Sequence, residues 1–236
     1  MNTFHAILSA AALTGFFATA TAAATTEGTT PATEKKWTHT ASVGFAVPFA
    51  KYKVEGKRVG TIDYGLDINY IGIARNGFSV EVSVAGGAST TEDIKFEGSK
   101  DDIQVGRFTS FDFGLGYTFG AGKKTSLSVL GTVGYEIAYF ESEKDTYKHE
   151  ELGKVDRHFS ETVGGLTLGG DVVFYRGFTD RAGMYASVGG RWIAKSASIS
   201  AVTYEKGDVS RTDTHTNADY SGLYSIVPAV GVMFNF

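Results

Sequence analysis

The sequence has no cysteine and only 3 prolines among 236 residues. The lack of cysteine excludes a disulfide scaffold, a cysteine-based zinc site and a cysteine nucleophile. A formal net charge of −4 provides no basic footprint, so nucleic-acid binding is not expected. Beyond residue 24 there is no apolar run of about 20 residues, the length that a membrane helix needs. Glycine, in contrast, is abundant at 30 residues, and many aromatic residues accompany it.

The first 36 residues differ in composition from the rest of the chain. Residues 1–24 contain an apolar core followed by small residues with A-x-A options, which is typical of a secretory signal peptide. Residues 25–36 are polar and threonine-rich, without periodicity, and we expect a flexible periplasmic tail. Residues 37–236 are expected to form the folded domain.

Apolar residues alternate with small or polar residues throughout this domain. Phe111, Phe113 and Leu115, for example, alternate with Asp112 and Gly114. Such alternation predicts β-strands, and we find no comparable helical run. The alternating segments are 37–49, 61–70, 78–85, 110–119, 126–139, 165–174, 184–192 and 220–236.

The connections between these segments alternate in length. Short connections that end hairpins, such as Asn76-Gly77, are followed by long, polar and charged ones. This order predicts an antiparallel meander with every long loop at one end and both termini at the other. The short connections are 75–77, 120–124 and 175–182, and the long ones are 50–58, 89–107, 140–161 and 195–219.

The bulk of the apolar face decides which side of this meander faces inward. An eight-stranded barrel has an interior just wide enough for side chains. The many Phe, Tyr, Leu and Val side chains would not fit there, whereas the Gly, Ser, Thr and Ala face would. Aromatics also gather at both ends of segments of about 10–13 residues, a length suited to tilted membrane strands. The sequence therefore predicts an all-β fold, an eight-stranded antiparallel up-and-down transmembrane β-barrel.

The domain resembles the small eight-stranded outer-membrane barrels, namely the opacity-protein group and the transmembrane domain of outer membrane protein A. The most specific feature is the last strand, which ends Phe234-Asn235-Phe236. The resemblance implies a Gram-negative-type outer membrane, periplasmic termini, surface loops and lipopolysaccharide neighbours. It also implies that the barrel-assembly machinery reads Phe234 and Phe236 as its signal.

Acidic residues dominate the polar face that we expect to line the lumen. Arg191 is the clear cation, and a pair with Asp112 or Glu136 is expected, whereas Glu81 and Asp171 have no obvious partner. The face admits two interpretations: a barrel plugged by a buried polar network, or a narrow, cation-preferring pore lined by small residues. The predicted lumen residues are Asp63, Asp67, Glu81, Asp112, Glu136, Asp171 and Arg191.

The long loops offer candidate contact residues of two kinds. Cations in the first loop could meet lipopolysaccharide phosphates: Lys51, Lys53, Lys57 and Arg58. Aromatic residues in the later loops could anchor a host or matrix ligand: Tyr147, Phe159 and Tyr204.

A third interpretation is a lipid-modifying enzyme, because His158, Ser160 and Glu161 lie together where a strand is expected to begin. Their spacing matches no motif, so no catalytic residue, metal or cofactor is expected. We predict a monomeric barrel with a structural or surface-interaction, adhesin-like role. A narrow porin-like channel is the first alternative, and a lipid A acyl-chain enzyme using His158 is the second.

Overall fold

The computed structural model describes residues 37–54, 57–91, 103–220 and 223–236. Within these ranges no helix is long and apolar enough to cross a membrane. The expected signal peptide (1–24) and tail (25–36) lie outside the described residues. The strands are β1 (Trp37–Ala46), β2 (Phe49–Val54), β3 (Lys57–Ala74), β4 (Phe78–Thr91), β5 (Ile103–Phe119), β6 (Thr125–Ser142), β7 (Asp145–His149), β8 (Gly153–Gly177), β9 (Ala182–Lys206), β10 (Val209–Tyr220) and β11 (Leu223–Asn235).

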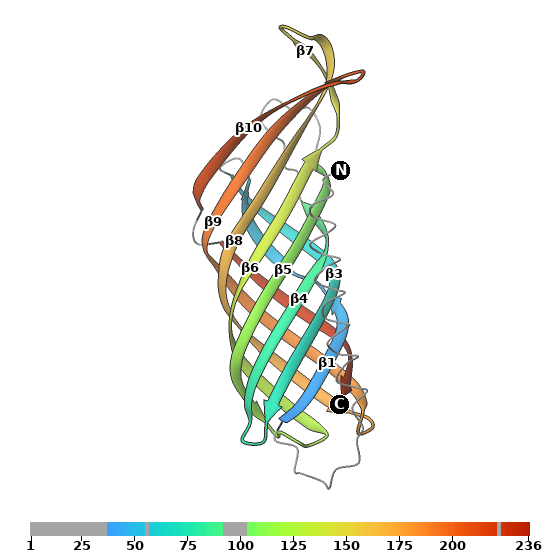
Figure 1. Cartoon of the computed structure of the whole chain (residues 1–236), viewed down its shortest axis with the longest axis vertical. Coiled ribbons are helices and arrows are strands. Elements are labelled where there is room, and N and C mark those ends of the chain that lie inside the picture. Colours follow the sequence, from blue (N-terminus) through green and yellow to red (C-terminus); the bar gives the residue numbers. More distant parts are fainter. Residues whose placement is uncertain (1–36, 55–56, 92–102, 221–222) are drawn as a thin grey trace. The chain divides into compact units, whose positions relative to one another are not determined.

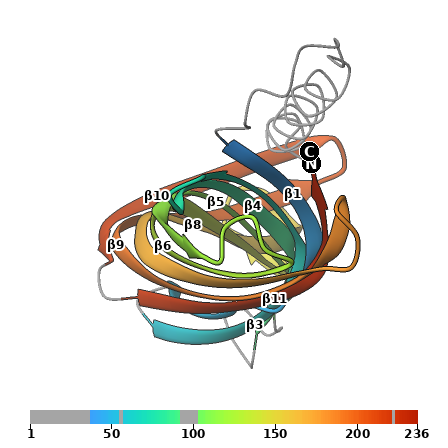
Figure 2. The ribbon, with the colours of Figure 1, turned by 90° about the horizontal axis from the view of Figure 1, so that it is seen from below.

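The strands close into a ring, which Figure 1 shows from the side and Figure 2 from below. The ring runs β1, β3, β4, β5, β6, β8, β9, β11 and back to β1. Each neighbouring pair is antiparallel. β2 continues β1 beyond Val47 and Pro48 and pairs with β3 and β11. The prediction of an eight-stranded up-and-down barrel is confirmed.

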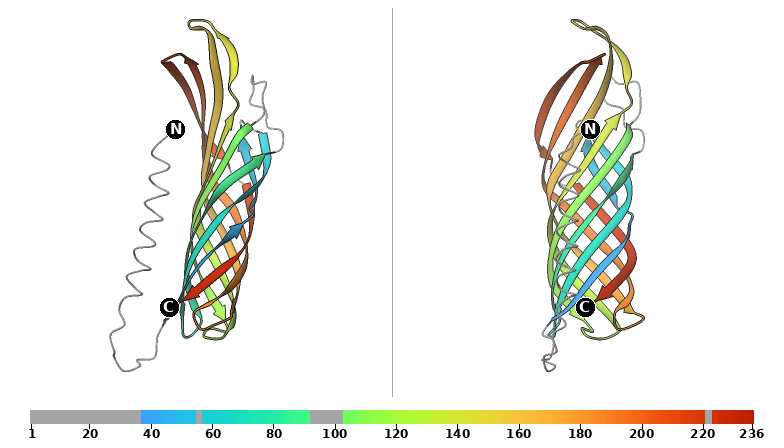
Figure 3. Two further views of the ribbon diagram at one scale, coloured as in Figure 1. Left: turned by 90° about the vertical axis from the view of Figure 1, so that its right-hand side faces the viewer. Right: turned by 45° about the vertical axis from the view of Figure 1, so that its right-hand side comes forward.

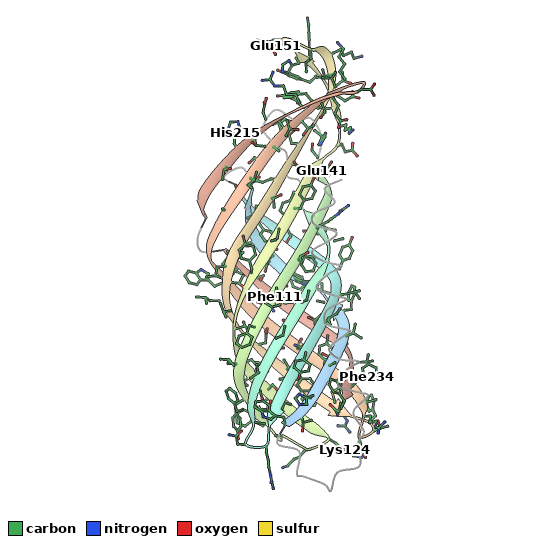
Figure 4. The ribbon with its side chains drawn as sticks, viewed as in Figure 1. Phe111, Lys124, Glu141, Glu151, His215 and Phe234 are labelled. Atoms are coloured by element: carbon green, nitrogen blue, oxygen red, sulfur yellow. The ribbon has the colours of Figure 1, made fainter. Side chains whose placement is uncertain are left out.

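The wall of the ring carries apolar side chains outside and polar ones inside. Phe111 is 51% exposed and Leu66 is 60% exposed, whereas Asp112 is 2% exposed. Figure 4 shows Phe111 and Phe234 on this wall. Alternate residues of a strand point to opposite faces, so a period of two produces this separation. An outward apolar band is the arrangement that a barrel adopts in a bilayer.

Three short turns join the strands at one end of the ring: 75–77, 120–124 and 178–181. In the first, Gly77 has a φ of 92°, which residues with a side chain rarely adopt. The Asn76 side chain accepts a hydrogen bond from the Phe78 N–H at 3.1 Å. Lys124 marks this end of the barrel in Figure 4.

The long connections 50–58, 140–161 and 195–219 differ from the prediction of polar loops where the structure describes them, whereas most of the connection 89–107 lies outside the described residues. β8 and β9 each run for 25 residues, about twice the predicted strand length. Above the barrel they pair with each other, and β7 and β10 add to their outer sides. This four-stranded extension, in the order β7-β8-β9-β10, is called the projecting sheet below (Figure 3). Only the part of a strand that lies in lipid needs an apolar face. The alternation of apolar and polar residues therefore ends before β8 and β9 do.

The interior is more apolar than the expected lining of small residues. An upper apolar layer and a lower one enclose the acidic residues of the lumen, and large aromatic side chains contribute to both. Serine, threonine and alanine do line much of the interior, as expected, and the two apolar layers are an addition that the prediction did not include. The upper layer contains Ala50, Tyr52, Ala138, Phe140, Phe159 and Ile193. The lower layer contains Ala46, Ile71, Ile73, Leu130, Val173, Tyr175, Tyr185, Ala229 and Met233.

Candidate functional site: a polar belt and a projecting sheet

The polar belt lies between the two apolar layers and is centred on Arg191. The Arg191 guanidinium lies 2.9 Å from an Asp112 oxygen and 3.7 Å from an Asp171 oxygen. Arg191 Nε also donates to Asp112 at 3.0 Å. The predicted pair with Asp112 is therefore present, and Asp171 shares the same cation. The belt consists of Asp63, Asp67, Asn69, Glu81, Asp112, Glu136, Asp171 and Arg191.

Tyrosine hydroxyl groups donate hydrogen bonds to two further carboxylates of the belt, Asp67 and Glu136. Tyr185 donates to Asp67 at 2.6 Å, and Tyr52 donates to Glu136. These two tyrosines come from the apolar layers, so each layer contributes one phenol to the belt. Glu136 therefore has a tyrosine partner in place of the alternative pairing with Arg191.

Two carboxylates of the belt, Glu81 towards the short turns and Asp63 towards the long hairpins, have more acceptors than donors. Asn69 donates to Glu81, but the second Glu81 oxygen has no hydrogen-bond partner among the described residues. Ser89 likewise serves one Asp63 oxygen and leaves the other unpartnered. Arg191 is the only lysine or arginine among the buried residues that the structure describes. The belt is thus an acidic interior with a single compensating charge, enclosed above and below by apolar side chains.

The projecting sheet brings together three aromatic residues from two of the predicted long connections, 140–161 and 195–219. Tyr147 on β7, Phe159 on β8 and Tyr204 on β9 surround Arg157. The Arg157 guanidinium carbon lies 4.3 Å from the Tyr147 ring centre and 4.9 Å from that of Phe159. The rings of Tyr147 and Tyr204 lie 6.0 Å apart. We call these four residues the aromatic–arginine face.

Ion pairs hold this face and the hairpins around it. Arg157 binds Asp145 through Nε at 3.0 Å and through Nη2 at 2.5 Å. These bonds raise the pKa of Arg157 further above its usual range. Lys144 binds Glu205 at 2.5 Å, and this hydrogen bond lowers the pKa of the Glu205 carboxyl. The guanidinium is therefore fixed in a bidentate geometry, with its faces against the rings.

A contact across the tip ties the two hairpins together. Arg211 on β10 binds Glu151, in the turn after β7, at 3.0 Å. Lys206 donates to the Leu152 carbonyl at 2.5 Å. In Figure 4, Glu151 lies at the tip of the projecting sheet and His215 on its β10 side.

The predicted basic loop is the β2–β3 hairpin. Lys51 is exposed, and its ammonium lies 5.5 Å from the Tyr224 ring centre. The backbones of Lys53 and Arg58 pair across this hairpin. The side chains of Lys53, Lys57 and Arg58 lie outside what the structure describes. An exposed lysine over an interfacial tyrosine can reach lipid phosphates while its stem covers the ring.

The three residues of the enzyme hypothesis do not converge. Glu161 is buried in the interior, and His158 and Ser160 occupy the opposite face of β8, as alternation along a strand requires. The carboxylate near His158 is Glu141 of β6, at 3.8 Å. The grouping of His158 with Glu161 is therefore wrong, because neighbours in sequence point to opposite sides of the wall.

The predicted assembly signal lies on the closing strand. Phe234 of β11 is 51% exposed and pairs with Ala41 of β1 and Ala182 of β9. Phe236 follows the end of β11 and is partly exposed. The exposed ring of Phe234 thus belongs to the outer apolar band at the short-turn end.

Comparison with known proteins places the chain in a family. Residues 12–203 match a family described as a domain of unknown function, DUF2715. The chain belongs to this family. No curated protein matches the DUF2715 chain. Among solved structures it is similar to a major outer membrane protein from Thermus thermophilus, with a TM-score of 0.53 and 12% identity over 84% of this chain and 99% of that one. It is also similar to Neisserial surface protein A, with a TM-score of 0.47 and 12% identity over 86% and 98% of the two chains.

The first of these structures shows that the DUF2715 chain has the fold of an outer-membrane β-barrel protein.

Sequence reasoning missed two features of the site. Arg157 was overlooked because nothing in the sequence links it to three aromatics on separate strands. Tyr52 was overlooked because an inward tyrosine has the same local pattern as a lipid-facing one.

Proposed function

We propose that this protein is an outer-membrane barrel that presents the projecting sheet outside the cell as a binding surface. The exposed apolar band supports insertion in a bilayer, since contiguous apolar surface on this scale is unfavourable in water. Short turns at one end and long hairpins at the other are typical of periplasmic and external ends, respectively. This orientation puts both termini in the periplasm and the aromatic–arginine face outside.

The aromatic–arginine face is the observation that carries this proposal. Tyrosine and arginine are enriched among the residues that dominate binding energy at interfaces. Tyr147 is 38% exposed, so its ring is available to a ligand. Arg157 is already ordered by Asp145, which lowers the entropy that a ligand must overcome. A host or matrix macromolecule fits this surface best.

The filled interior supports a binding role over the alternative of a pore. A conducting lumen needs a continuous path along water-accessible side chains. Asp63 is 0% exposed and Tyr52 is 1% exposed, although both point into the ring. Planar bilayers containing folded protein are expected to show no channel steps, and regular cation-selective steps would refute this part of the proposal.

Lipopolysaccharide is proposed as the neighbour of the rim. Lys51 stands beside Tyr224 on the outer wall, within reach of phosphates in the outer leaflet. A Lys51→Glu variant is expected to bind lipopolysaccharide micelles more weakly, with the loss decreasing at high salt. Equal binding by both proteins at low salt would contradict this assignment.

The binding role is tested with Tyr147→Ala/Tyr204→Ala displayed on cells. The probes are an array of purified matrix glycoproteins and sulfated glycans. The matched control is Ile199→Ala, since Ile199 is 50% exposed on the same strand as Tyr204, on the opposite face. We expect the tyrosine variant to lose binding and the control to keep it. Absence of binding by the folded wild type, or equal binding by the tyrosine variant, would refute the proposal.

A further inference from the structure

β10 is an edge strand with an open side. Its residues from Val209 to Tyr220 pair with β9, and no second strand pairs with it among the described residues. The segment 209–216 is exposed except for Asp213, which is half-buried. Figure 3 shows the β9–β10 hairpin standing away from the barrel. The N–H and C=O groups on its outer side are therefore available to another strand.

Lysine and proline, two of the usual protections of a free edge, are absent from residues 209–216. Natural edge strands are blocked by lysine, proline or inward charges. Residues 209–216 read VSRTDTHT, with threonine at the alternating positions 212, 214 and 216 and with one charge of each sign, Arg211 and Asp213. Threonine favours strand pairing. This edge is suited to pair with an added strand.

Charge indicates which strand fits. In an antiparallel pair of two β10 strands centred on Thr212, Arg211 of each copy lies opposite Asp213 of the other. The symmetry creates this ion pair twice, on the face where Arg211 already contacts Asp213 within one chain at 3.4 Å. Centring on Asp213 or on Arg211 would instead place like charges opposite each other, which is unfavourable. We infer that β10 pairs with β10 of a second copy of this chain, in the register centred on Thr212.

The geometry of this pairing determines where the second copy lies. Symmetric antiparallel neighbours in a sheet are related by a two-fold axis perpendicular to that sheet. β9 continues the barrel wall, so this axis lies in the membrane plane and inverts the second barrel. The two copies must therefore be embedded in two facing membranes. This inference rests on the proposed external position of the projecting sheet and identifies one partner as the same protein on another cell.

The structure also predicts the distance between the membranes. Thr203, opposite Thr212, lies 11 positions (203 minus 192) beyond Trp192, which is exposed on the wall. At about 3.3 Å per residue and a tilt of about 40°, the centre of the contact lies about 28 Å above Trp192. The two bilayers should be about 55 Å apart between these levels. One short strand pair is weak, but many contacts between two membranes add by avidity.

Vesicle tethering with charge-reversed variants tests the inference. Two populations of proteoliposomes, labelled with different dyes, carry wild type, Arg211→Asp or Asp213→Arg. Protease access to the hairpins confirms their orientation, and heat-modifiability confirms folding. Each single variant places like charges opposite each other twice and should reduce self-tethering roughly tenfold or more. Vesicles with Arg211→Asp mixed with vesicles carrying Asp213→Arg should tether like wild type.

The mixture distinguishes pairing from local damage, because a misfolded hairpin could not be rescued by another misfolded one. Electron tomography of wild-type contacts should show the spacing derived above. Absence of tethering by wild type, unchanged tethering by the single variants, or a mixture that fails to tether would each overturn the inference. Binding of the wild type to the ligand array and tethering of its vesicles are separate measurements, so failure of the proposed binding role and failure of self-pairing are distinguishable.

Discussion

Replacement of Arg191 by methionine would test the polar belt, since methionine retains much of the volume and loses the charge. Arg191 lies 2.9 Å from Asp112 and 3.7 Å from Asp171. At an effective dielectric constant of about 20, these distances correspond to attractions of roughly 6 and 4 kcal/mol before desolvation is counted. Desolvation offsets much of this, and removal of one member of a buried pair typically costs about 3–5 kcal/mol. We expect R191M to lower the free energy of unfolding by that amount.

The measurement is urea unfolding of the barrel in lipid vesicles, followed by fluorescence of Trp192 on the outer wall. Asp112→Asn provides the second arm of a double-mutant cycle. The double variant should lose less free energy of unfolding than the sum of the losses in the two single variants. The reason is that neither Arg191 nor Asp112 is then left as a buried charge without its partner. A value for R191M within about 0.5 kcal/mol of wild type, as for an ordinary surface substitution, would refute the reasoning.

Three further predictions concern the wall and the tip. Gly189→Ala should lower the free energy of unfolding by about 1–3 kcal/mol, because its new methyl group would clash with the Asp171 and Arg191 side chains. The control is Gly190→Ala, whose methyl group would meet no atom within 4 Å. This control should have the same free energy of unfolding as wild type in the same urea assay. Phe113→Arg on the outer wall should cost about 2–4 kcal/mol in vesicles, and a neutral result would argue against lipid contact. Because the pKa of Glu205 is lowered, its bond to Lys144 stabilises the tip at neutral pH and is lost as the pH falls through that lowered pKa. The protection factors of amides at the tip, which are corrected for the intrinsic exchange rate at each pH, should therefore fall in acid, and unchanged protection factors would exclude this tie.

The sequence was sufficient for the ring because lipid imposes a pattern on every strand that crosses it. Phe111, Asp112 and Phe113 reveal the two faces of the wall, and Asn76-Gly77 reveals a turn. The same logic limited the expected partner of Arg191 to Asp112 or Glu136, since these residues point inward at a similar height, and the structure has Asp112.

The projecting sheet could not be predicted in this way. Outside the lipid, a strand such as β10 needs no apolar face, so its residues look like a polar loop. The convergence of Tyr147, Phe159 and Tyr204 depends on registers between distant segments. The inward orientation of Tyr52 and Tyr175 was not predicted. Alternation in the sequence separates two faces, but it does not show that a narrow interior has room for a few large side chains.

A register shift in β9 changes which residue numbers face inward in the projecting sheet: odd numbers below the shift and even numbers above it. Leu166 of β8 pairs with Lys195 and Thr167 pairs with Ile193, so Ala194 is one residue in excess. Below this point Arg191 faces inward with odd-numbered neighbours, and above it Ser198 is buried and Ile199 is exposed. Deletion of Ala194 would therefore leave an unbroken ladder with β8, in which Tyr204 still lies opposite Arg157 and Ile199 still points outward. Ala194 thus sets whether odd or even residue numbers of β9 lie on the inner face, and deleting it should leave both the barrel and the displayed face intact, whereas deleting a residue of the regular ladder, such as Val202, should shift the tip of β9 by one position against β8.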